Sequence, residues 1–500
     1  MTEDEAARRF VAEFGSGDPA GPAPPENFEA ELRAWTGCRT PDAVRRDLAE
    51  FGMEVALVHD GQTLVDDPYM LARGDVLDVD VAGLGQLWVP GHIDPLMAAE
   101  APRFHWAELA DPEGIDWLAP RLPAVQEECA DKALFADLVV VEITDTPGAS
   151  FAATLFADYG AATYILETAG AASGAKADAP ALWTALARNK HSVIVDPAEG
   201  NDLVTELLGR ADVVLTDIPK RRWADHPWLA CLLEMPNAPA IVSIFAPGAD
   251  RPDLWPWSTH PALSAAASGL MAITGWEDGP PVQPEVPLAD YCAGALAALQ
   301  VAAALWRGKS RGLVIEEPTH RALSRMIEWQ CPAASMLGYP AVRQGNSLPL
   351  NMGIGSLCRS SDGKYISVSA VGDKIVSNLL RLIGGDAMLN DPRFATMEAR
   401  RIYGPEVNRL MVEWAALHTA DAFMRLAIEH DIVTGIVQDA GGIKQDPQVQ
   451  ARANLVDVPH GSVSLPLVAA TPRLEKWTLP IRPVAEESLG DLITRISAGG

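Results

Sequence analysis

Residues 138–167 read LVVVEITDTPGASFAATLFADYGAATYILE. The first six residues are mostly apolar, which is typical of a short β-strand buried on both faces. A helix is expected from about Ser150 to Tyr159, and residues 162–167 form the next apolar strand. Two strands separated by one helix indicate a parallel βαβ unit. This stretch therefore predicts an α/β fold.

The same alternation continues along the chain. Further strands are expected at 193–195, 213–215 and 240–245, with a helix over 201–209. We therefore expect a doubly wound parallel sheet, which binds ligands beyond the carboxyl ends of its strands. A helical region is expected at 261–307. Residues 313–450 mix helices with short strands, one of which is predicted at 364–368.

The composition is that of a folded protein with a strongly acidic surface. The chain has 500 residues, of which 48% are hydrophobic, with 67 acidic and 39 basic side chains and a net charge of −28. A surface this negative repels phosphate backbones and anionic lipid, so we expect no nucleic-acid or membrane partner. The helical run 295–306 is too short to span a bilayer.

Cysteine usage and the N-terminal residues suggest a reducing compartment. The six cysteines are scattered and form no CxxC pair, so neither a disulfide framework nor a structural zinc site is expected. The first ten residues, MTEDEAARRF, lack the apolar segment of a signal peptide. We expect a cytoplasmic protein with no metal.

The chain contains an internal repeat. A shift of 379 residues aligns 35–79 with 414–458, and the register of helix, strand and turn is kept without a gap. The identical pairs are Trp35 and Trp414, Thr40 and Thr419, Asp42 and Asp421, Ala43 and Ala422, Arg46 and Arg425, Glu50 and Glu429, Val58 and Val437, Asp60 and Asp439, Asp67–Pro68 and Asp446–Pro447, Ala72–Arg73 and Ala451–Arg452, and Asp78–Val79 and Asp457–Val458. Two distant copies indicate duplication of a module rather than a solenoid.

Common catalytic and nucleotide motifs are missing, but short signatures occur in a fixed order. There is no GxGxxG, GxxxxGK[ST], HExxH or GxSxG. The signatures present are FAATLFADYGA (151–161), RNKHSVIV (188–195), ADVVL (211–215), ASGLMAITG (267–275), GPP (279–281), DYCAGALAALQVAAAL (290–305), DGKY (362–365), DPRFATMEAR (391–400) and DPQVQAR (446–452).

In this order and spacing, from about residue 136 to 475, the chain resembles the class III CoA-transferases of the CaiB/BaiF type. The resemblance implies a doubly wound large domain, a smaller α/β domain and an interlocked homodimer, or else a hetero-oligomer. Coenzyme A and acyl-CoA are then substrates, exchanged with a small carboxylic acid, and no cofactor is permanently bound. We expect a leader at 1–27, an N-terminal module at 28–130, a large domain at 131–330, a small domain at 331–455 and a return segment at 456–500.

The resemblance assigns the catalytic aspartate to Asp290, which follows the GPP turn at the start of a long helix. A carboxylate that attacks an acyl-CoA thioester forms an aspartyl anhydride and releases CoA thiolate, which divides one difficult exchange into easier steps. A helix N-terminus also stabilises the carboxylate anion. Local sequence by itself would equally suit a helix cap.

Two alternatives stay open. His260 precedes Asp290 by 30 residues, which resembles the acid–base pair of the α-methylacyl-CoA racemases in the same superfamily. Several signatures also depart from the family pattern, namely DTPGAS (145–150), ETAGAASGAK (167–176) and the Asp217–Ile218 pair. The chain could therefore be a non-catalytic CoA-binding subunit of a hetero-oligomer.

CoA phosphates require cations and amide donors. By resemblance, Arg188 and Lys190 in the RNKHSV stretch contact CoA, as do Asp217, Arg221 and Arg222 after the ADVVL strand. Lys220–Arg222 reads equally well as a solvated basic loop. Gly345 is the expected remnant of a glycine-rich loop that shields the intermediate.

Overall fold

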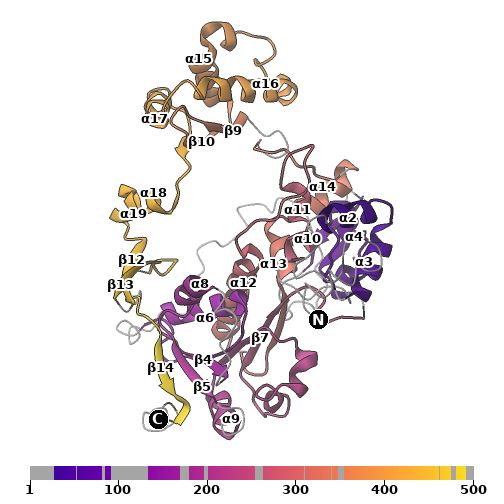
Figure 1. Ribbon diagram of the computed structural model, residues 1–500, viewed down its shortest axis with the longest axis vertical. Helices are drawn as coiled ribbons and strands as arrows, with labels where there is room; N and C mark the ends of the chain where they lie inside the picture. The colour runs from indigo at the N-terminus through magenta and orange to yellow at the C-terminus, as the bar shows by residue number, and fades with distance from the viewer. Residues whose placement is uncertain are drawn as a thin grey trace, which may run out of the picture. The chain divides into compact units, whose positions relative to one another are not determined.

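The computed structural model describes residues 28–51, 53–81, 85–91, 133–168, 179–195, 201–253, 263–308, 310–338, 340–346, 354–460, 462–474, 480–490 and 492 (Figure 1). The chain divides into two compact units. The large unit comprises residues 1–271, 283–340 and 455–500, and the small unit comprises 272–282 and 341–454. The expected boundary between large and small domains was at residue 330.

A seven-stranded sheet forms the centre of the large unit. All its neighbouring strands are parallel. The strands lie in the order β14 (Ala485–Ser488), β5 (His191–Val195), β4 (Ala162–Thr168), β3 (Val139–Ile143), β6 (Val213–Thr216), β7 (Ala240–Phe245) and β8 (Val314–Pro318). All residues of β6 and β7 are buried, as expected for apolar strands covered on both faces. The predicted α/β fold with a doubly wound sheet is confirmed.

Helices cover both faces of this sheet. The described helices between residues 147 and 337 are α6 (Pro147–Asp158), α8 (Pro180–Leu186), α9 (Asn201–Arg210), α10 (Ser264–Ala267), α11 (Leu270–Ile273), α12 (Leu288–Trp306), α13 (Thr319–Met326) and α14 (Gln330–Leu337), with 3₁₀ turns η3 (Lys220–Asp225) and η4 (Ala230–Leu233). One core layer joins the sheet to α6, α12 and α13, and the other joins it to α9, η3 and η4. α6 begins earlier than expected, because Pro147 occupies its first position, where no amide donor is needed.

α12 is long and apolar enough, by length and composition, to cross a membrane. Its alanines instead pack in the core of the large unit: Ala293, Ala297 and Val301 are fully buried against α6 and the sheet. The apolar run that the sequence placed in a buried helix is therefore a core helix here.

The crevice of the sheet is set by its strand order. From β3 the chain proceeds through β4 to β5 on one side, and β6 then returns to the other side of β3. The connections that leave the carboxyl ends of β3 and β6 therefore diverge, and a crevice opens between them. Asp145 and Asp217 follow these two strands.

The N-terminal residues form a small module on the large unit. It consists of α2 (Phe28–Thr36), α3 (Pro41–Glu50), α4 (Gly61–Val65), α5 (Pro68–Arg73), β1 (Val76–Val81) and β2 (Gly85–Pro90). Strands β1 and β2 form an antiparallel hairpin. In Figure 1 the module lies beside α10 and α14 of the same unit. A second antiparallel hairpin, β12 (Leu455–His460) and β13 (Val463–Val468), precedes β14.

The small unit has its own core. A three-stranded antiparallel sheet places β10 (Tyr365–Ala370) between β9 (Ile354–Arg359) and β11 (Thr434–Ile436). The apolar sides of α15 (Asp373–Leu389), α16 (Met397–Ala415) and α17 (Ala420–Glu429) pack against it. Two short helices, α18 (Ala440–Gln445) and α19 (Pro447–Ala451), follow. The strand predicted at 364–368 is present as β10.

Candidate active site

Asp290 lies in the first turn of α12 and is 4% exposed. Its carboxylate accepts hydrogen bonds from its own backbone N–H and from that of Gly148. Gly148 is the second residue of α6. The carboxylate therefore lies at the N-termini of two helices, where unpaired amide donors and the helix dipoles favour an anion.

The hydrogen bond between Gly148 and Asp290 depends on a close approach of α6 to α12. A Cβ on Gly148 would lie 3.2 Å from Oδ1 of Asp290 and 3.0 Å from Cγ2 of Ile244. A Cβ on Gly294 would lie 2.5 Å from the carbonyl oxygen of Gly148. Because real Cβ atoms do not come that close to backbone, any side chain at 294 would separate the helices. These two glycines bring the Gly148 amide to the carboxylate.

Burial raises the pKa of Asp290 to about 6, the Gly148 and Asp290 amides oppose this shift, and the negative charge of Asp217 adds to it. Burial dominates, so the carboxylate is less well solvated than a surface aspartate. It is still mostly ionised at neutral pH. An ionised carboxylate with little hydration is suited to nucleophilic attack.

A cavity of about 350 Å³ opens beside Asp290. Its walls come from the start of α12, the segment before it, α8, and the helices α10, α11 and α13. The lining residues are mostly apolar: Pro147, Leu182, Ala265, Leu270, Gln283, Pro284, Glu285, Val286, Pro287, Leu288, Ala289, Asp290 and Leu323. We call this the apolar pocket. It can hold an uncharged or weakly polar group next to the carboxylate.

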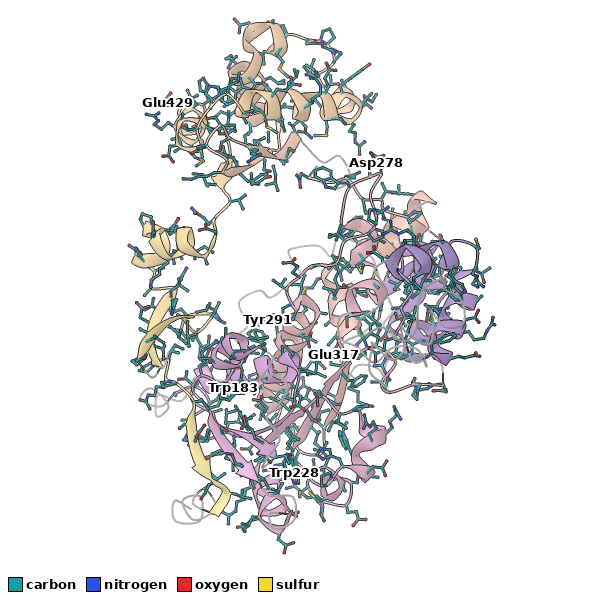
Figure 2. All side chains as sticks on the ribbon, viewed as in Figure 1. Trp183, Trp228, Asp278, Tyr291, Glu317 and Glu429 are labelled. Carbon is teal, nitrogen blue, oxygen red and sulfur yellow. The ribbon has the colours of Figure 1, made fainter. Side chains whose placement is uncertain are left out.

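A second cavity, of about 200 Å³, lies at the crevice between β3 and β6. Its lining includes the carboxyl groups of Glu142, Asp145, Glu167 and Asp217, and we call it the acidic pocket. Pro147 and Leu182 line both pockets. Trp183 of α8 also lines the acidic pocket (Figure 2). Tyr291 on α12 packs edge-on against Phe151 of α6.

Asp217 is half-buried in the acidic pocket. The backbone N–H of Asp145 donates to its Oδ2 atom at 3.1 Å. Burial raises the pKa of Asp217 to about 6, and the Asp145 charge adds to the shift, while hydrogen bonds from Asp145 and Thr144 oppose it. Several carboxylates lining one small cavity repel phosphate groups.

The cations nominated in the RNKHSV stretch form ion pairs inside the protein. The Arg188 guanidinium donates from Nη2 to Oδ2 of Asp158 at 2.8 Å and from Nε to Oδ1 at 3.2 Å. Lys190, 1% exposed, donates from Nζ to Oε2 of Glu142 at 2.6 Å and to the carbonyl oxygen of Ser150 at 2.8 Å. Burial lowers the pKa of Lys190, and the Glu142 carboxylate opposes that shift. Here both cations join the sheet to α6, and contact with CoA stays a prediction.

The other nominated cations are on the surface. Lys220, Arg221 and Arg222 lie in η3, which follows β6, and all three are exposed. The Arg221 Nε atom donates to the carbonyl oxygen of Ala249 at 2.5 Å. We call these residues the basic turn. They are close in sequence to Asp217, so positive charge borders the acidic crevice.

A model of CoA-transferase family III matches residues 135–488. The chain belongs to CoA-transferase family III. The match includes the sheet, α12 with Asp290, and the small unit, and it leaves the N-terminal module outside. The chain is therefore a CoA-transferase, with acyl-CoA thioesters and carboxylic acids as its class of substrates.

Curated relatives of this family III enzyme carry transferase names. It is 27% identical over 364 residues to the succinyl-CoA–D-citramalate CoA-transferase of Chloroflexus aurantiacus, which covers 69% of this chain and 90% of that protein. It is 24% identical over 355 residues to the succinyl-CoA–L-malate CoA-transferase alpha subunit of Chloroflexus aurantiacus, which covers 67% of this chain and 82% of the relative.

The fold has close matches among solved structures. A CaiB/BaiF family protein from Brucella suis superposes with a TM-score of 0.62 at 22% sequence identity, and the match covers 73% of this chain and 99% of that one. This likeness confirms the fold of the family III enzyme.

Two nominated residues are not among those that form the site described above. His260 lies outside the described residues, so its pairing with Asp290 stays a prediction. Gly345 belongs to the small unit, where its N–H donates to the carbonyl oxygen of Gly275 at 2.9 Å. Its φ is +57°, and a Cβ there would lie 2.4 Å from the Trp276 ring. Only glycine suits this position. Its shielding role stays a prediction.

Sequence reasoning did not find some members of the transferase site. Gly148 and Gly294 matter because two helices meet at them, although they are 146 positions apart. Asp145 joins Asp217 across the crevice. Gly148 and Asp145 do fall in the stretch DTPGAS (145–150), which departs from the family pattern, and that departure is an indirect signal.

Proposed function

We propose that this enzyme transfers coenzyme A between an acyl-CoA thioester and a carboxylic acid through a covalent intermediate on Asp290. The observation that carries the proposal is the buried Asp290 carboxylate, with its pKa raised to about 6, beside an apolar pocket. It occupies the position to which the family resemblance assigns the nucleophile.

The proposed reaction begins when an Asp290 oxygen attacks the thioester carbonyl carbon. The C–S bond breaks, and CoA thiolate leaves with the electron pair, so an acyl–aspartyl anhydride forms. The thiolate then attacks the aspartyl carbonyl, which releases the donor acid as its carboxylate and leaves an aspartyl–CoA thioester. The acceptor carboxylate repeats the two steps in reverse, which gives its CoA thioester and regenerates Asp290.

The residues around Asp290 support such chemistry in separate ways. The packed helices α6 and α12 remove water from the carboxylate, which favours attack on carbon. The Gly148 N–H orients one carboxylate oxygen. We propose that the apolar pocket holds the uncharged acyl chain or the pantetheine arm next to the carboxylate.

We propose that the anionic end of CoA contacts the basic turn rather than the acidic pocket. Lys220, Arg221 and Arg222 are exposed, whereas the charges of Arg188 and Lys190 already meet carboxylates. Exposed cations can pair with phosphate without breaking a buried ion pair. Both reported relatives have succinyl-CoA in their names, so succinyl-CoA is the first donor to test here.

The test is to trap the intermediate. The purified full-length enzyme is incubated with succinyl-CoA, quenched with hydroxylamine, digested and analysed by mass spectrometry. Hydroxylamine attacks the activated aspartyl carbonyl, so a hydroxamate is expected on the peptide that contains Asp290. No hydroxamate should form in Asp290→Asn, and the matched variant Asp217→Asn should still form it.

Either of two results would overturn the proposal: CoA exchange by Asp290→Asn at the wild-type rate, or a hydroxamate on another residue. The same samples in deuterated water test the racemase alternative. Exchange of the α-proton of a branched acyl-CoA, without any hydroxamate, would favour acid–base chemistry at Asp290 over covalent transfer.

A further inference from the structure

The N-terminal module repeats the architecture of a later segment of the chain. A shift of 379 residues places α3 on α17 and β1 on β12 with identical bounds, and it places α4, α5 and β2 within one residue of the bounds of α18, α19 and β13. Helix-capping side chains also correspond, namely Thr40 and Thr419, Asp60 and Asp439, and Asp67 and Asp446. The family model matches residues 135–488 and so includes only the second copy. The contacts of the first copy therefore indicate what it adds to the enzyme.

The module packs on the large unit through a buried apolar cluster. Its members are Leu64, Val65, Tyr69, Met70 and Val76 of the module with Ala267 of α10 and Cys331 of α14, all at most 4% exposed. The main chains come closest at Gly61, where a Cβ would lie 2.8 Å from the carbonyl oxygen of Gln330 in α14. Packing this close leaves the module little freedom to move against α10 and α14.

Helix α10 contacts both the module and the apolar pocket. The backbone N–H of His59 donates to the carbonyl oxygen of Ala266 at 3.1 Å. Ala265, the residue before, lines the apolar pocket, and Ala267, the residue after, belongs to the cluster shared with the module. All three alanines are buried. Because protein interiors transmit displacement, a shift of the module against α10 moves a wall of the pocket.

Helix α13 is bound to the module through Asp75. The Oδ2 atom of Asp75 lies 3.2 Å from Nε2 of His320, and its Oδ1 atom lies 3.6 Å from Nη1 of Arg321. Leu323, one turn further along α13, is 1% exposed and lines the apolar pocket. Since backbone hydrogen bonds hold one helical turn to the next, the position of His320 determines that of Leu323.

The Asp75 carboxylate is ionised where it contacts α13. Burial raises its pKa, but the hydrogen bond with His320 and the charge of Arg73 outweigh burial and place the pKa below its ordinary value. The Nε atom of Arg73 lies 3.3 Å from Oδ2 of Asp75. Loss of the carboxylate would leave buried cations with fewer partners, which is unfavourable. The contact between Asp75 and α13 is therefore a strong one.

The two helices are also joined to each other and to the start of α12. The Ser264 and Thr319 hydroxyl oxygens, on α10 and α13, lie 2.7 Å apart and are buried. One buried cluster contains Ala265, Ala289 and Leu323. Ala289 immediately precedes Asp290. Packed side chains therefore connect the module, through α10 and α13, to the turn of α12 that carries the proposed nucleophile.

We propose that the N-terminal module fixes the width of the apolar pocket by holding α10 and α13, and so determines which acyl groups the enzyme exchanges. This inference rests on the proposed function, because it takes the apolar pocket as the acyl site. Leu64 and Asp75 are then positioning residues, which act on the substrate through the two helices. A hydrophobic pocket of fixed width discriminates about tenfold or more between groups that differ by one methylene. Loosening α10 or α13 reduces that discrimination.

The experiment compares two leucines of the module that are almost equally buried. Leu64 is 4% exposed in the cluster that includes Ala267, whereas Leu48 is 5% exposed in a cluster with Trp35 and Phe51, whose members all belong to the module. The full-length wild type, Leu64→Ala and Leu48→Ala are assayed with straight-chain donors from acetyl-CoA to octanoyl-CoA and with succinate as acceptor. The discrimination ratio is kcat/KM for the preferred donor divided by kcat/KM for the donor with one more methylene.

We expect Leu64→Ala to lower the discrimination ratio at least about fivefold, since a widened pocket accepts the extra methylene. The change should come from KM, with kcat for the preferred donor unchanged. Leu48→Ala removes the same atoms from a site of equal burial, so it should lower the melting temperature by a similar amount. It should leave the discrimination ratio unchanged, because its cluster does not include α10 or α13.

Asp75→Asn tests the contact with α13 separately, and it decides the matter alone if Leu64→Ala does not fold. It keeps the size of the side chain, removes its charge, and should also lower the discrimination ratio. Asp78→Asn is its control, because Asp78 is an exposed aspartate on β1 of the same module. The inference is overturned if Leu64→Ala and Leu48→Ala change the ratio equally, or if Asp75→Asn leaves it unchanged.

Failure of the proposed function would give a different result, namely a wild type that binds acyl-CoA but exchanges none. The dissociation constants of the same donors, measured by calorimetry, would then give the discrimination ratio and decide the inference. A wild type that neither binds nor exchanges any of the donors would overturn both.

Discussion

The apolar and acidic pockets lie beside one another at the carboxyl edge of the same sheet, yet they favour opposite ligands. In each, one aspartate has its pKa raised to about 6. At Asp290 the neighbours are apolar side chains and two helix amides, whereas at Asp217 they are Asp145 and further carboxylates. A raised pKa therefore does not identify the nucleophile. The surroundings favour Asp290 as the proposed nucleophile because, of the two pockets described here, the apolar one suits an acyl group next to the carboxylate.

The comparison is tested most directly by removing each carboxylate in turn. We expect Asp290→Asn to lower kcat for CoA exchange at least about a thousandfold, because it removes the proposed nucleophile. Asp217→Asn should lower kcat less than about tenfold, which corresponds to about 1.4 kcal/mol of activation free energy, since Asp217 is not the nucleophile in the proposed mechanism. Both variants are assayed with succinyl-CoA and a panel of acceptor acids. Equal losses would show that the two pockets share the chemistry.

The wall of the acidic pocket predicts a large effect on stability. Lys190→Met leaves Glu142 buried without its partner, which should cost about 3–5 kcal/mol of unfolding free energy. The double variant Lys190→Met/Glu142→Leu should recover most of that loss, because it removes both charges. Urea unfolding measures the free energies. An unchanged urea midpoint together with a raised KM for acyl-CoA would instead indicate that Lys190 contacts CoA.

The buried pair at Lys190 also shows where sequence reasoning ended. The strands of the sheet could be predicted because short apolar runs carry their own signal, and Asp290 could be nominated from the order of the surrounding motifs. Arg188 and Lys190 were nominated as CoA contacts, which stays a prediction, and their ion-pair partners Asp158 and Glu142 lie 30 and 48 positions away. No local pattern reveals which carboxylate a distant cation will meet in the fold.

The close approach of Gly148 to Gly294 was unpredictable for the same reason. A glycine in a helix reads as a weak helix former, and its value appears only when a second helix is placed against it. The repeat is the counterexample: its conserved caps and turns act within a few residues, so the sequence alone revealed both copies in register. Local determinants were therefore predictable, and long-range contacts were not.

The pH dependence of stability shows whether the ionised Asp290 carboxylate lowers or raises the free energy of unfolding. The folded-state pKa of Asp290 is about 6 and its ordinary value is 3.8, so ionisation disfavours the fold as pH rises from about 4 to 6. Asp290→Asn should therefore be more stable than wild type above pH 6, by up to about 3 kcal/mol at about 1.4 kcal/mol per pKa unit. The gain should vanish below pH 4, where Asp290 is protonated in both states.

Urea unfolding at pH 4 and at pH 8 measures this difference. Asp217→Asn should change stability in the same direction, since burial raises that pKa as well. A stabilised but inactive Asp290→Asn enzyme is expected of a site that sacrifices stability for reactivity. Destabilisation at pH 8 would mean that the carboxylate, through its contact with Gly148, holds α6 and α12 together.

The smallest expected effect concerns the basic turn, whose positive charge borders the acidic pocket. Arg222→Gln should raise KM for acyl-CoA about fivefold and leave kcat unchanged, because an exposed phosphate contact contributes about 1 kcal/mol to binding. The difference should shrink as salt rises to about 0.5 M, where screening acts within a few ångströms.

Arg311→Gln is the control, since Arg311 is a partly exposed arginine that pairs with Asp212. If both variants raise KM equally, the effect comes from net charge and the basic turn has no specific role. If only Arg222→Gln raises KM, the basic turn binds the phosphate groups of CoA. The acidic pocket is then available to a part of the substrate that forms hydrogen bonds.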